Sequence, residues 1–350
     1  MKTLNKLSIG FLSILFFATS AFAGNPDRQG EAGAAELLLN PWAGSAGIHT
    51  MNTSSISGLE AMRLNIAGLS RIEGSELVFA NTRLYEGSTL KLNALGYATR
   101  VGKSSAFGIS LMSVDFGDIA RTTTSNPEGD GGTFSPSFFN IGLGYSYTYE
   151  NKISVGLLVR GVSESLPNVS AFGFAIDAGV QYVTGENDNF KLGISLRNVG
   201  SPMKFGGEGL SFQGDNPEGT AQYLLTYDQR AENFELPSVL NIGMSYDFII
   251  TDKMTFRTLT NFTSNAFSRD QLGAGAEFMY NDMITIRGGY KADLGASGDA
   301  VQNVYSGLSG GVSVLLPFSA GGSSKIGIDY GYRATNPFRG SHNFSVRLLF

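Results

Sequence analysis

Residues 341–350, at the end of the chain, read SHNFSVRLLF. Phe344, Val346, Leu348 and Phe350 share one phase of a two-residue period, and the other phase is polar from residue 343 to 347. Such alternation predicts a β-strand with one apolar and one polar face. In a soluble sheet this terminal strand would leave a hydrophobic edge in water. In a membrane β-barrel it pairs with the first strand, and no edge remains.

The same alternation recurs from residue 75 to the end of the chain, in about fourteen segments long enough to cross a bilayer as tilted strands. The clearest segment is 138–150. Nine charged residues fall on the polar phase of their own segments: Arg160, Asp177, Arg197, Asp247, Glu277, Arg287, Asp329, Arg333 and Arg347. Charge is costly on the lipid face of a barrel, so we expect these side chains to line the lumen. A soluble β-sandwich would instead place them in water.

Connection lengths support the barrel. Short turns are predicted at 150–152, 185–189, 251–253 and 281–282, and longer polar loops at 118–136, 163–169, 203–237, 265–271 and 293–302. Outer-membrane barrels have short turns on the periplasmic side and long loops outside. The sequence therefore predicts an all-β membrane protein, an antiparallel transmembrane barrel of about fourteen strands over residues 75–350 with a short N-terminal helical plug. An even number of strands predicts N- and C-termini on the periplasmic side.

Residues 1–23 have a basic start, an apolar run and a small-residue cleavage site, and are predicted to be a signal peptide. Residues 24–74 are predicted to form a periplasmic lead-in and the plug. Within them Ser57 and Glu60 have the spacing of a capping box before a short helix. The predicted plug residues are Ser57, Glu60, Arg63, Asn65 and Gly68. A helix packed against a soluble sheet is the alternative for this segment. A phase slip near Leu111 and Met112 predicts a bulge.

Composition limits the functions open to the chain. It has no cysteine, so disulfides and thiolate metal sites are excluded. The formal net charge of −5 argues against nucleic-acid binding, which needs a basic patch. His49 and His342 are the only histidines, and neither lies in a catalytic or metal-binding motif. The sequence therefore predicts no enzyme activity, no cofactor and no metal site.

Two short motifs carry a family resemblance. Residues 33–39, GAAELLL, resemble the opening of mature members of the PorV/PorQ family of the type IX secretion system of Bacteroidetes. Residues 64–69, LNIAGL, resemble that family's W-N-P-A-G-L, with Leu64 and Ile66 in place of Trp and Pro. The plug followed by about fourteen strands is also similar to the FadL-like barrel superfamily. A terminal Phe350 resembles the assembly signal that the barrel-assembly machinery reads on outer-membrane barrels.

The resemblance implies docking without catalysis, in the outer membrane of a Gram-negative bacterium and in contact with its lipid. It implies contacts with the secretion translocon, the attachment-complex proteins and the C-terminal domains of secreted cargo. The candidate partner loop is 203–237, with Phe205, Leu210, Phe212, Tyr223 and Tyr227, because apolar side chains on a long external loop often mark a partner surface. A loop that folds back over the lumen is the alternative. A FadL-type channel for hydrophobic small molecules is the second functional hypothesis. Paired charges in the lumen would favour a filled, closed interior, and therefore the docking hypothesis.

Overall fold

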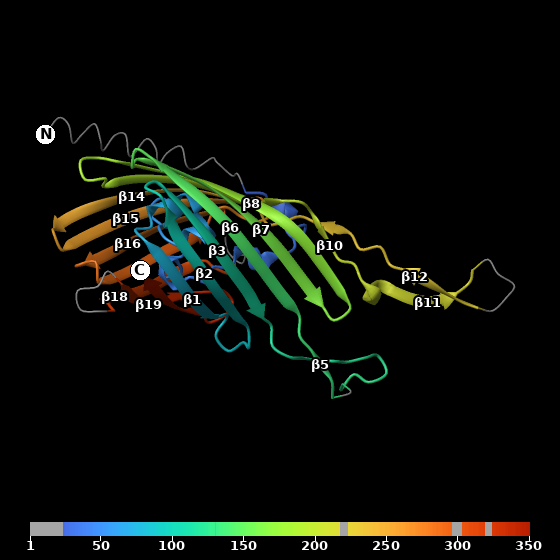
Figure 1. The fold of residues 1–350 in the computed structure, drawn as a ribbon. Helices are drawn as coiled ribbons and strands as arrows, with labels where there is room; N and C mark the ends of the chain where they lie inside the picture. The colour runs from blue at the N-terminus through green and yellow to red at the C-terminus, as the bar shows by residue number, and fades with distance from the viewer. Residues whose placement is uncertain (1–23, 130, 218–222, 296–302, 319–323) are drawn as a thin grey trace.

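A closed antiparallel β-barrel of fourteen strands makes up most of the molecule (Figure 1). The computed structural model describes residues 24–129, 131–217, 223–295, 303–318 and 324–350, so the predicted signal peptide lies outside the described residues. The barrel strands, in order around the barrel, are β1 Ser75–Arg83, β2 Lys91–Val101, β3 Ser105–Asp115, β6 Ser137–Tyr149, β7 Ile153–Leu166, β8 Val169–Thr184, β9 Phe190–Gly200, β14 Val239–Thr251, β15 Met254–Asn265, β16 Gln271–Tyr280, β17 Ile284–Asp293, β18 Gly307–Pro317, β19 Lys325–Arg333 and β20 Ser341–Leu349. The predicted fold class is confirmed.

The last strand closes the barrel against the first. β20 pairs antiparallel with β1, from Glu76 opposite Leu349 to Arg83 opposite His342. Beyond β20, the amide of Phe350 donates to the carbonyl of Ser75 over 2.9 Å, and Ser75 returns a bond of 3.1 Å. The closing strand therefore leaves no hydrophobic sheet edge.

Side chains alternate between an outer and an inner face. In β6 every second residue from Phe139 to Tyr149 is exposed, and every residue between them is buried. The outer face is apolar, because it carries most of the exposed large hydrophobic side chains. Among the described residues, no helix is both long and apolar enough to cross a membrane.

The bulge predicted near Met112 does not form. β3 keeps a continuous register with both of its neighbours through Leu111 and Met112. The apparent phase slip arises because Met112 and Val114 are apolar yet face inward, where they join the buried core. Register shifts occur instead between Ile176 and Ala178 and between Ile249 and Thr251.

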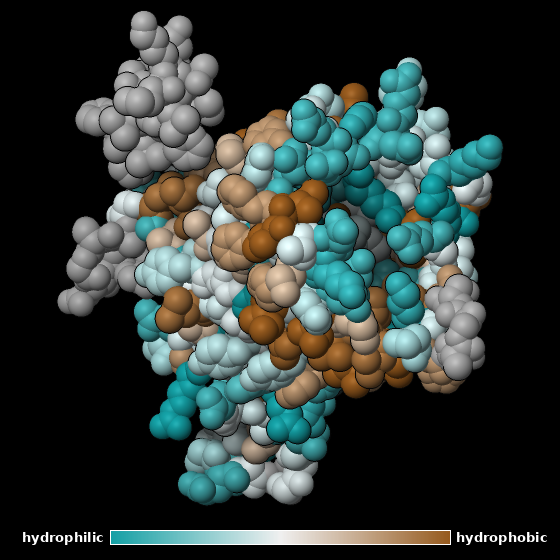
Figure 2. Space-filling model, turned by 90° about the vertical axis from the view of Figure 1, so that its left-hand side faces the viewer, coloured by the Kyte–Doolittle hydropathy of each residue, from teal (hydrophilic) through white to brown (hydrophobic). Residues whose placement is uncertain are grey.

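The two ends of the barrel differ. At one, the tight-turn end, strands connect through 102–104, 150–152, 185–189, 252–253 and 281–283. At the other, the long-loop end, lie the connections 116–136, 201–238, 266–270 and 294–306. The loop predicted at 163–169 is wrong, because β7 and β8 pair up to Leu166 opposite Val169 and leave only 167–168 between them. Figure 2 faces the tight-turn end and shows a large hydrophilic area beside a run of hydrophobic residues.

Small sheets extend from the long-loop end. They pair β4 Ile119–Ala120 with β5 Thr133–Phe134, β10 Met203–Lys204 with β13 Asn233–Phe234, and β11 Ser211–Asp215 with β12 Leu224–Asp228. The 3-10 helix η4, Glu208–Leu210, precedes β11. Figure 1 shows that β11 and β12 project well away from the barrel.

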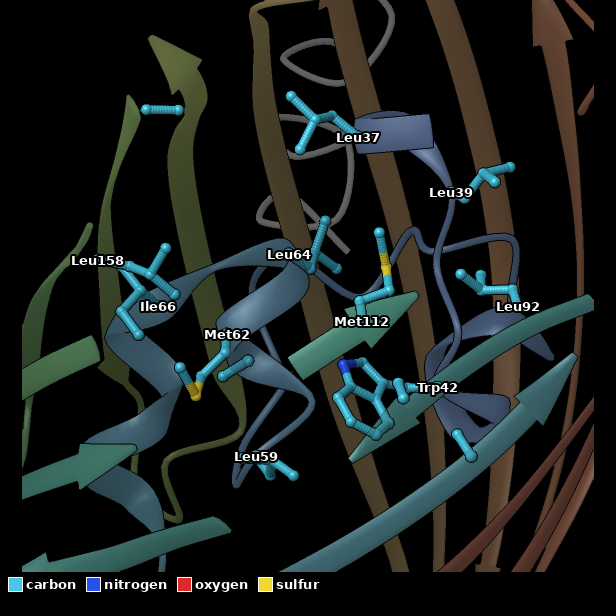
Figure 3. Packing of buried hydrophobic residues seen from close by; sticks show 14 of the residues in the cluster. Leu37, Leu39, Trp42, Leu59, Met62, Leu64, Ile66, Leu92, Met112 and Leu158 are labelled. Carbon is cyan, nitrogen blue, oxygen red and sulfur yellow. The ribbon is translucent and has the colours of Figure 1, made fainter. Parts of the chain in front are cut away.

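The N-terminal segment runs through the barrel interior (Figure 1). Its short helices are η1 Pro26–Arg28, η2 Ala35–Leu38, α2 Ala43–Ala46, α3 Ala61–Leu64 and η3 Ile66–Arg71. Apolar residues of this segment and inward-facing residues of the wall form one buried cluster. Figure 3 shows members of this cluster from both sources, among them Trp42 and Met62 from the segment with Met112 and Leu158 from the strands.

The two ends of the described chain lie at opposite ends of the barrel. The guanidinium of Arg28 lies 3.2 Å from the carboxylate of Glu235 and 4.4 Å from the ring centre of Phe267, both in long-loop connections. By contrast, Arg71 donates to the carbonyl of Lys152 in a tight turn, and Phe350 lies at that end. The described residues thus place the lead-in and the C-terminus at opposite ends of the barrel, whereas the sequence predicted both on one side. Which end faces the periplasm stays a prediction. The chain threads the lumen once before β1 begins.

Candidate functional site in the barrel lumen

One wall of the lumen binds the backbone around α2. The carbonyl of Asn40 accepts from Arg333 over 3.2 Å and from Asn343 over 3.0 Å. The amide of Ala43 donates to the hydroxyl of Ser345 over 2.9 Å, and Arg287 donates to the carbonyl of Gly44 over 3.1 Å. Polar side chains of β17, β19 and β20 therefore satisfy backbone groups that a four-residue helix leaves unpaired.

Glu60 does not form the predicted capping box. It occupies the N-cap position of α3 without a side-chain capping bond, and Ser57 is exposed. The carboxylate of Glu60 instead accepts from the amides of Gly44 and Ser45, over 3.2 and 2.8 Å, at the start of α2. Glu76, from β1, accepts from Leu59 over 2.8 Å. These backbone amides bind carboxylates 15 to 17 residues away in the chain, whereas the capping-box pattern considers only residues three apart.

Asn65 binds the N-terminal segment to β8, on the side of the lumen away from β19 and β20. Its amide nitrogen donates to the carbonyl of Thr53 over 2.9 Å and to that of Val180, in β8, over 3.1 Å. Its side-chain oxygen accepts from the amide of Ala67 over 3.2 Å, at the start of η3. Gly68 follows where the chain turns, and a Cβ there would lie 2.1 Å from the carbonyl oxygen of Ile56. Asn65 therefore acts through its side-chain hydrogen bonds, and glycine is required at position 68 because two backbone segments approach closely there.

Arg63 is buried and binds main chain. Its guanidinium donates to the carbonyl oxygens of Glu36, Leu37 and Leu39. Its own carbonyl accepts from Arg197 of β9. Arg63 thus holds η2 against α3.

Inward-facing charges pair in the tight-turn half of the lumen. Arg347 binds both carboxylate oxygens of Asp329, over 2.7 and 2.8 Å. Arg257 bridges Asp247 and Glu277, over 2.5 and 3.0 Å, and Arg287 reaches Glu277 over 3.2 Å. Lys191 completes this network with a contact of 2.6 Å to Asp247. The charges form paired groups along neighbouring strands.

A separate buried pair lies at the irregularity between β8 and β9. Arg160 contacts Asp177 over 2.7 Å and donates to Asn140 and to the carbonyl of Met62. The second carboxylate oxygen of Asp177 accepts from the backbone amide of Asn198 over 2.7 Å, where the β8–β9 register shifts. The carboxylate of Asp177 therefore accepts from a backbone amide where the regular pairing of β8 and β9 is interrupted, and it also neutralises the buried guanidinium of Arg160.

Arg197 and Arg333 line a cavity of about 230 Å³ nearer the long-loop end. Arg333 lies over the ring of Tyr305, 4.1 Å from its centre. No ion pair of either guanidinium occurs among the described residues.

The residues of the predicted partner loop separate into two groups. Phe205 is half-buried against Phe234, with ring centres 5.5 Å apart, and packs against the barrel core. Leu210 ends η4 and is half-buried. Phe212 stacks on Tyr227 across the β11–β12 pair at 5.5 Å, and Phe212 and Tyr223 are about half exposed. Only the second group projects from the barrel.

Several residues of the lumen were absent from the predicted set. Lys191 and Arg257 join the charged network, Glu76 accepts from the backbone of the N-terminal segment, and Lys291 enters the cavity wall. Lys191 shares its phase with Arg197, and Lys291 with Arg287, so the two-residue period could have found both. Arg257 lies in the noisy segment 252–266, where the period is a weaker guide.

Solved structures share this fold at low sequence identity. The monoaromatic hydrocarbon channel CymD is 16% identical with a TM-score of 0.57, and covers 89% of this chain and 97% of its own. The toluene transporter TbuX of Ralstonia pickettii is 15% identical with a TM-score of 0.55, at 89% and 97% coverage. A FadL homologue of Pseudomonas aeruginosa is 12% identical with a TM-score of 0.53, at 88% and 98% coverage. At such identities the likeness shows the FadL-like fold alone.

The family comparison is more specific. Residues 85–348 match the family described as type IX secretion system membrane protein PorP/SprF. A search among curated proteins found no match. The matched family is not the PorV/PorQ group that the two short motifs resemble, so that narrower resemblance is not confirmed. Because the match spans most of the barrel, the chain belongs to the PorP/SprF family and is an outer-membrane component of the type IX secretion system.

Proposed function

We propose that this barrel serves type IX secretion as a docking component and that its lumen is not the route of the secreted chain. The observation that carries the proposal is the N-terminal segment, which runs through the lumen from one end to the other and leaves small cavities beside it. It is bonded on both sides, through Asn40 to β19 and β20 and through Asn65 to β8. The family is one of secretion membrane proteins, which agrees with a role without catalysis.

Opening the lumen would require many bonds to break together. Besides the contacts of Asn40 and Asn65, Gln181 donates to the carbonyls of Thr53 and Ile56, and Ser146 donates to that of Ala67. Each such bond contributes about 1 kcal/mol net, and a buried group left without its partner costs about 1–3 kcal/mol. The cavities beside the segment, of about 230 and 360 Å³, are far too small for a polypeptide in transit.

The docking surface we propose is the projecting β11–β12 pair, with Phe212, Tyr223 and Leu224 each at least half exposed. Apolar side chains on a protruding external element favour a protein contact. We place the long-loop end outside the cell, as in other outer-membrane barrels, and Phe350 on the periplasmic side, where the barrel-assembly machinery would read it. The partners would be the translocon, the attachment-complex proteins and the C-terminal domains of secreted cargo.

The test is a mild-detergent pull-down of the tagged protein from its native outer membrane, with bound proteins identified by mass. Wild type is expected to recover the type IX translocon or cargo sharing a C-terminal domain. The double variant Phe212→Ser with Leu224→Ser should lose that recovery. Ile119→Ser, an exposed residue of the β4 loop, is the matched control and should retain it. Wild type without any secretion component would refute docking.

A FadL-type channel for apolar small molecules is the second candidate. The cavity of about 360 Å³ at the long-loop end favours it, because Phe116, Phe138 and Phe205 line that cavity. The fold likeness to hydrocarbon channels agrees with it. Native mass spectrometry of the purified barrel separates the two hypotheses. A bound apolar ligand, with no secretion partner in the pull-down, would favour the channel.

A further inference from the structure

Cations and carboxylates are unevenly distributed along the lumen. In the tight-turn half, Arg257, Arg287, Arg347 and Lys191 each contact a carboxylate of the wall within 3.2 Å. In the half nearer the long loops, Arg197, Lys291 and Arg333 come from three different strands, β9, β17 and β19, to one cavity of about 230 Å³. None of the described residues that line this cavity carries a carboxylate.

The three cations have few partners of their own. Lys291 is only 8% exposed, and neither a hydrogen bond nor an ion pair to its ammonium occurs within the described part of the chain. Arg197 and Arg333 donate to the carbonyls of Arg63 and Asn40, and their Nε atoms are buried without an acceptor. Asp293 lies two residues from Lys291, but its carboxylate accepts from Gln271, Asn303 and Ser306 instead.

His49 of the N-terminal segment adds a polar group to the same cavity. Its Nε2 is buried and has no hydrogen-bond partner among the described residues. Burial and the charges of Lys291 and Arg333 lower the pKa of His49 to about 3, so the ring is neutral at physiological pH. The neutral ring adds no further charge to the cavity.

We propose that this cavity is a binding site for a small organic anion whose charged group is a carboxylate or phosphate. Burying unpaired cations costs several kcal/mol each, and an anion that accepts from Lys291 and both guanidinium groups removes that cost. Leu38 and Leu64 contribute an apolar wall, which suits a ligand with a compact hydrophobic body. An apolar cavity of about 150 Å³ holds one benzene, so this one holds a ligand of about benzoate size.

The test uses the purified full-length barrel in detergent, titrated by calorimetry with benzoate, benzyl alcohol and inorganic phosphate. Benzoate is expected to bind, and benzyl alcohol, which has its shape without its charge, is expected to bind at least about tenfold more weakly. Binding of phosphate as tightly as benzoate would assign the site to the phosphate group and leave the apolar wall without a role. A failure of both anions to bind would overturn the proposal.

Variants of two lysines locate the site. Lys291→Met should weaken benzoate at least about tenfold, which corresponds to ~1.4 kcal/mol. Lys291→Arg keeps the charge and should retain most of the binding of benzoate. Such retention would show that the weaker binding in Lys291→Met comes from the lost charge and not from misfolding. Lys191→Met is the matched control, because that lysine pairs with Asp247 in the other half of the lumen. Equal weakening in the two Met variants would place benzoate elsewhere and refute the site.

Discussion

Replacing Asp177 by Asn should destabilise the barrel more than any comparable loss of a surface charge. Arg160 and Asp177 are 3% and 4% exposed, and their closest atoms lie 2.7 Å apart. In the variant the new amide can still accept from Asn198. Arg160 then retains Asn140 and the carbonyl of Met62 but loses its only carboxylate among the described residues.

The expected loss of unfolding free energy in Asp177→Asn follows from the burial of the ion pair. Removing one partner of a buried ion pair costs about 3–5 kcal/mol, because the other charge stays desolvated without compensation. The matched control is Asp188→Asn, which removes the partner of Lys152 in an exposed pair. These two side chains are 47% and 48% exposed, and such pairs contribute about 0–1 kcal/mol.

Unfolding by urea in lipid vesicles measures both variants. Trp42 is the single tryptophan of the chain and is buried in the lumen at 2% exposure, so its fluorescence reports loss of the segment from the barrel. Heat-modified electrophoretic mobility reports the barrel itself.

A double-mutant cycle with Arg160→Met isolates the pair. The double variant should be less destabilised than the sum of the single variants by more than about 1 kcal/mol, since coupling in such pairs reaches about 3 kcal/mol. A cost for Asp177→Asn no larger than for Asp188→Asn, or a coupling near zero, would refute the reasoning.

Three further outcomes are expected. Gly179→Ala places a Cβ 2.0 Å from the side-chain oxygen of Asn65 and should cost about 1–3 kcal/mol in the same urea assay, whereas Gly206→Ala, with open space around it, should cost little. Burial and the charge of Asp329 raise the pKa of Glu60 above its ordinary value of 4.5, so the folded state binds the proton more tightly and stability should rise as the pH falls toward that ordinary value. Glu60→Gln cannot titrate, and an equally steep pH dependence in that variant would contradict the assignment. Phe350→Ala should lower the amount of folded barrel in cell membranes without a large change in unfolding midpoint, because the ring is 57% exposed. Phe344→Ala is the control, and equal yields of the two variants would contradict an assembly role.

The strands follow from the sequence because their pattern is local. A two-residue period shows which side chains share a face, and it predicted the closing strand and the alternating phase of β6. The period fails where the inner face is itself apolar. Met112 and Val114 face the N-terminal segment and not water, so polarity no longer distinguishes inside from outside.

The lumen could be predicted only in part. The nine charges lie on inward-facing positions, but their partners depend on register between strands, which no single strand encodes. Glu60 shows the same limit, because its acceptor role joins residues sixteen positions apart through a turn of the segment. The path of the segment from the long-loop end to the tight-turn end depends on contacts such as that of Arg28 with Glu235, 207 residues away.

Alternation, loop lengths and the pattern of the closing strand are local properties that point to one architecture, so the order of residues is enough to predict a closed membrane barrel. The folded structure was needed to show that the described chain enters its own barrel from the long-loop end. Only it showed that Arg197, Lys291 and Arg333, from three strands, surround a cavity without a carboxylate. The physical reason is that charge balance and hydrogen bonding in a lumen depend on which residues meet across it, and barrel closure brings together residues far apart in the chain.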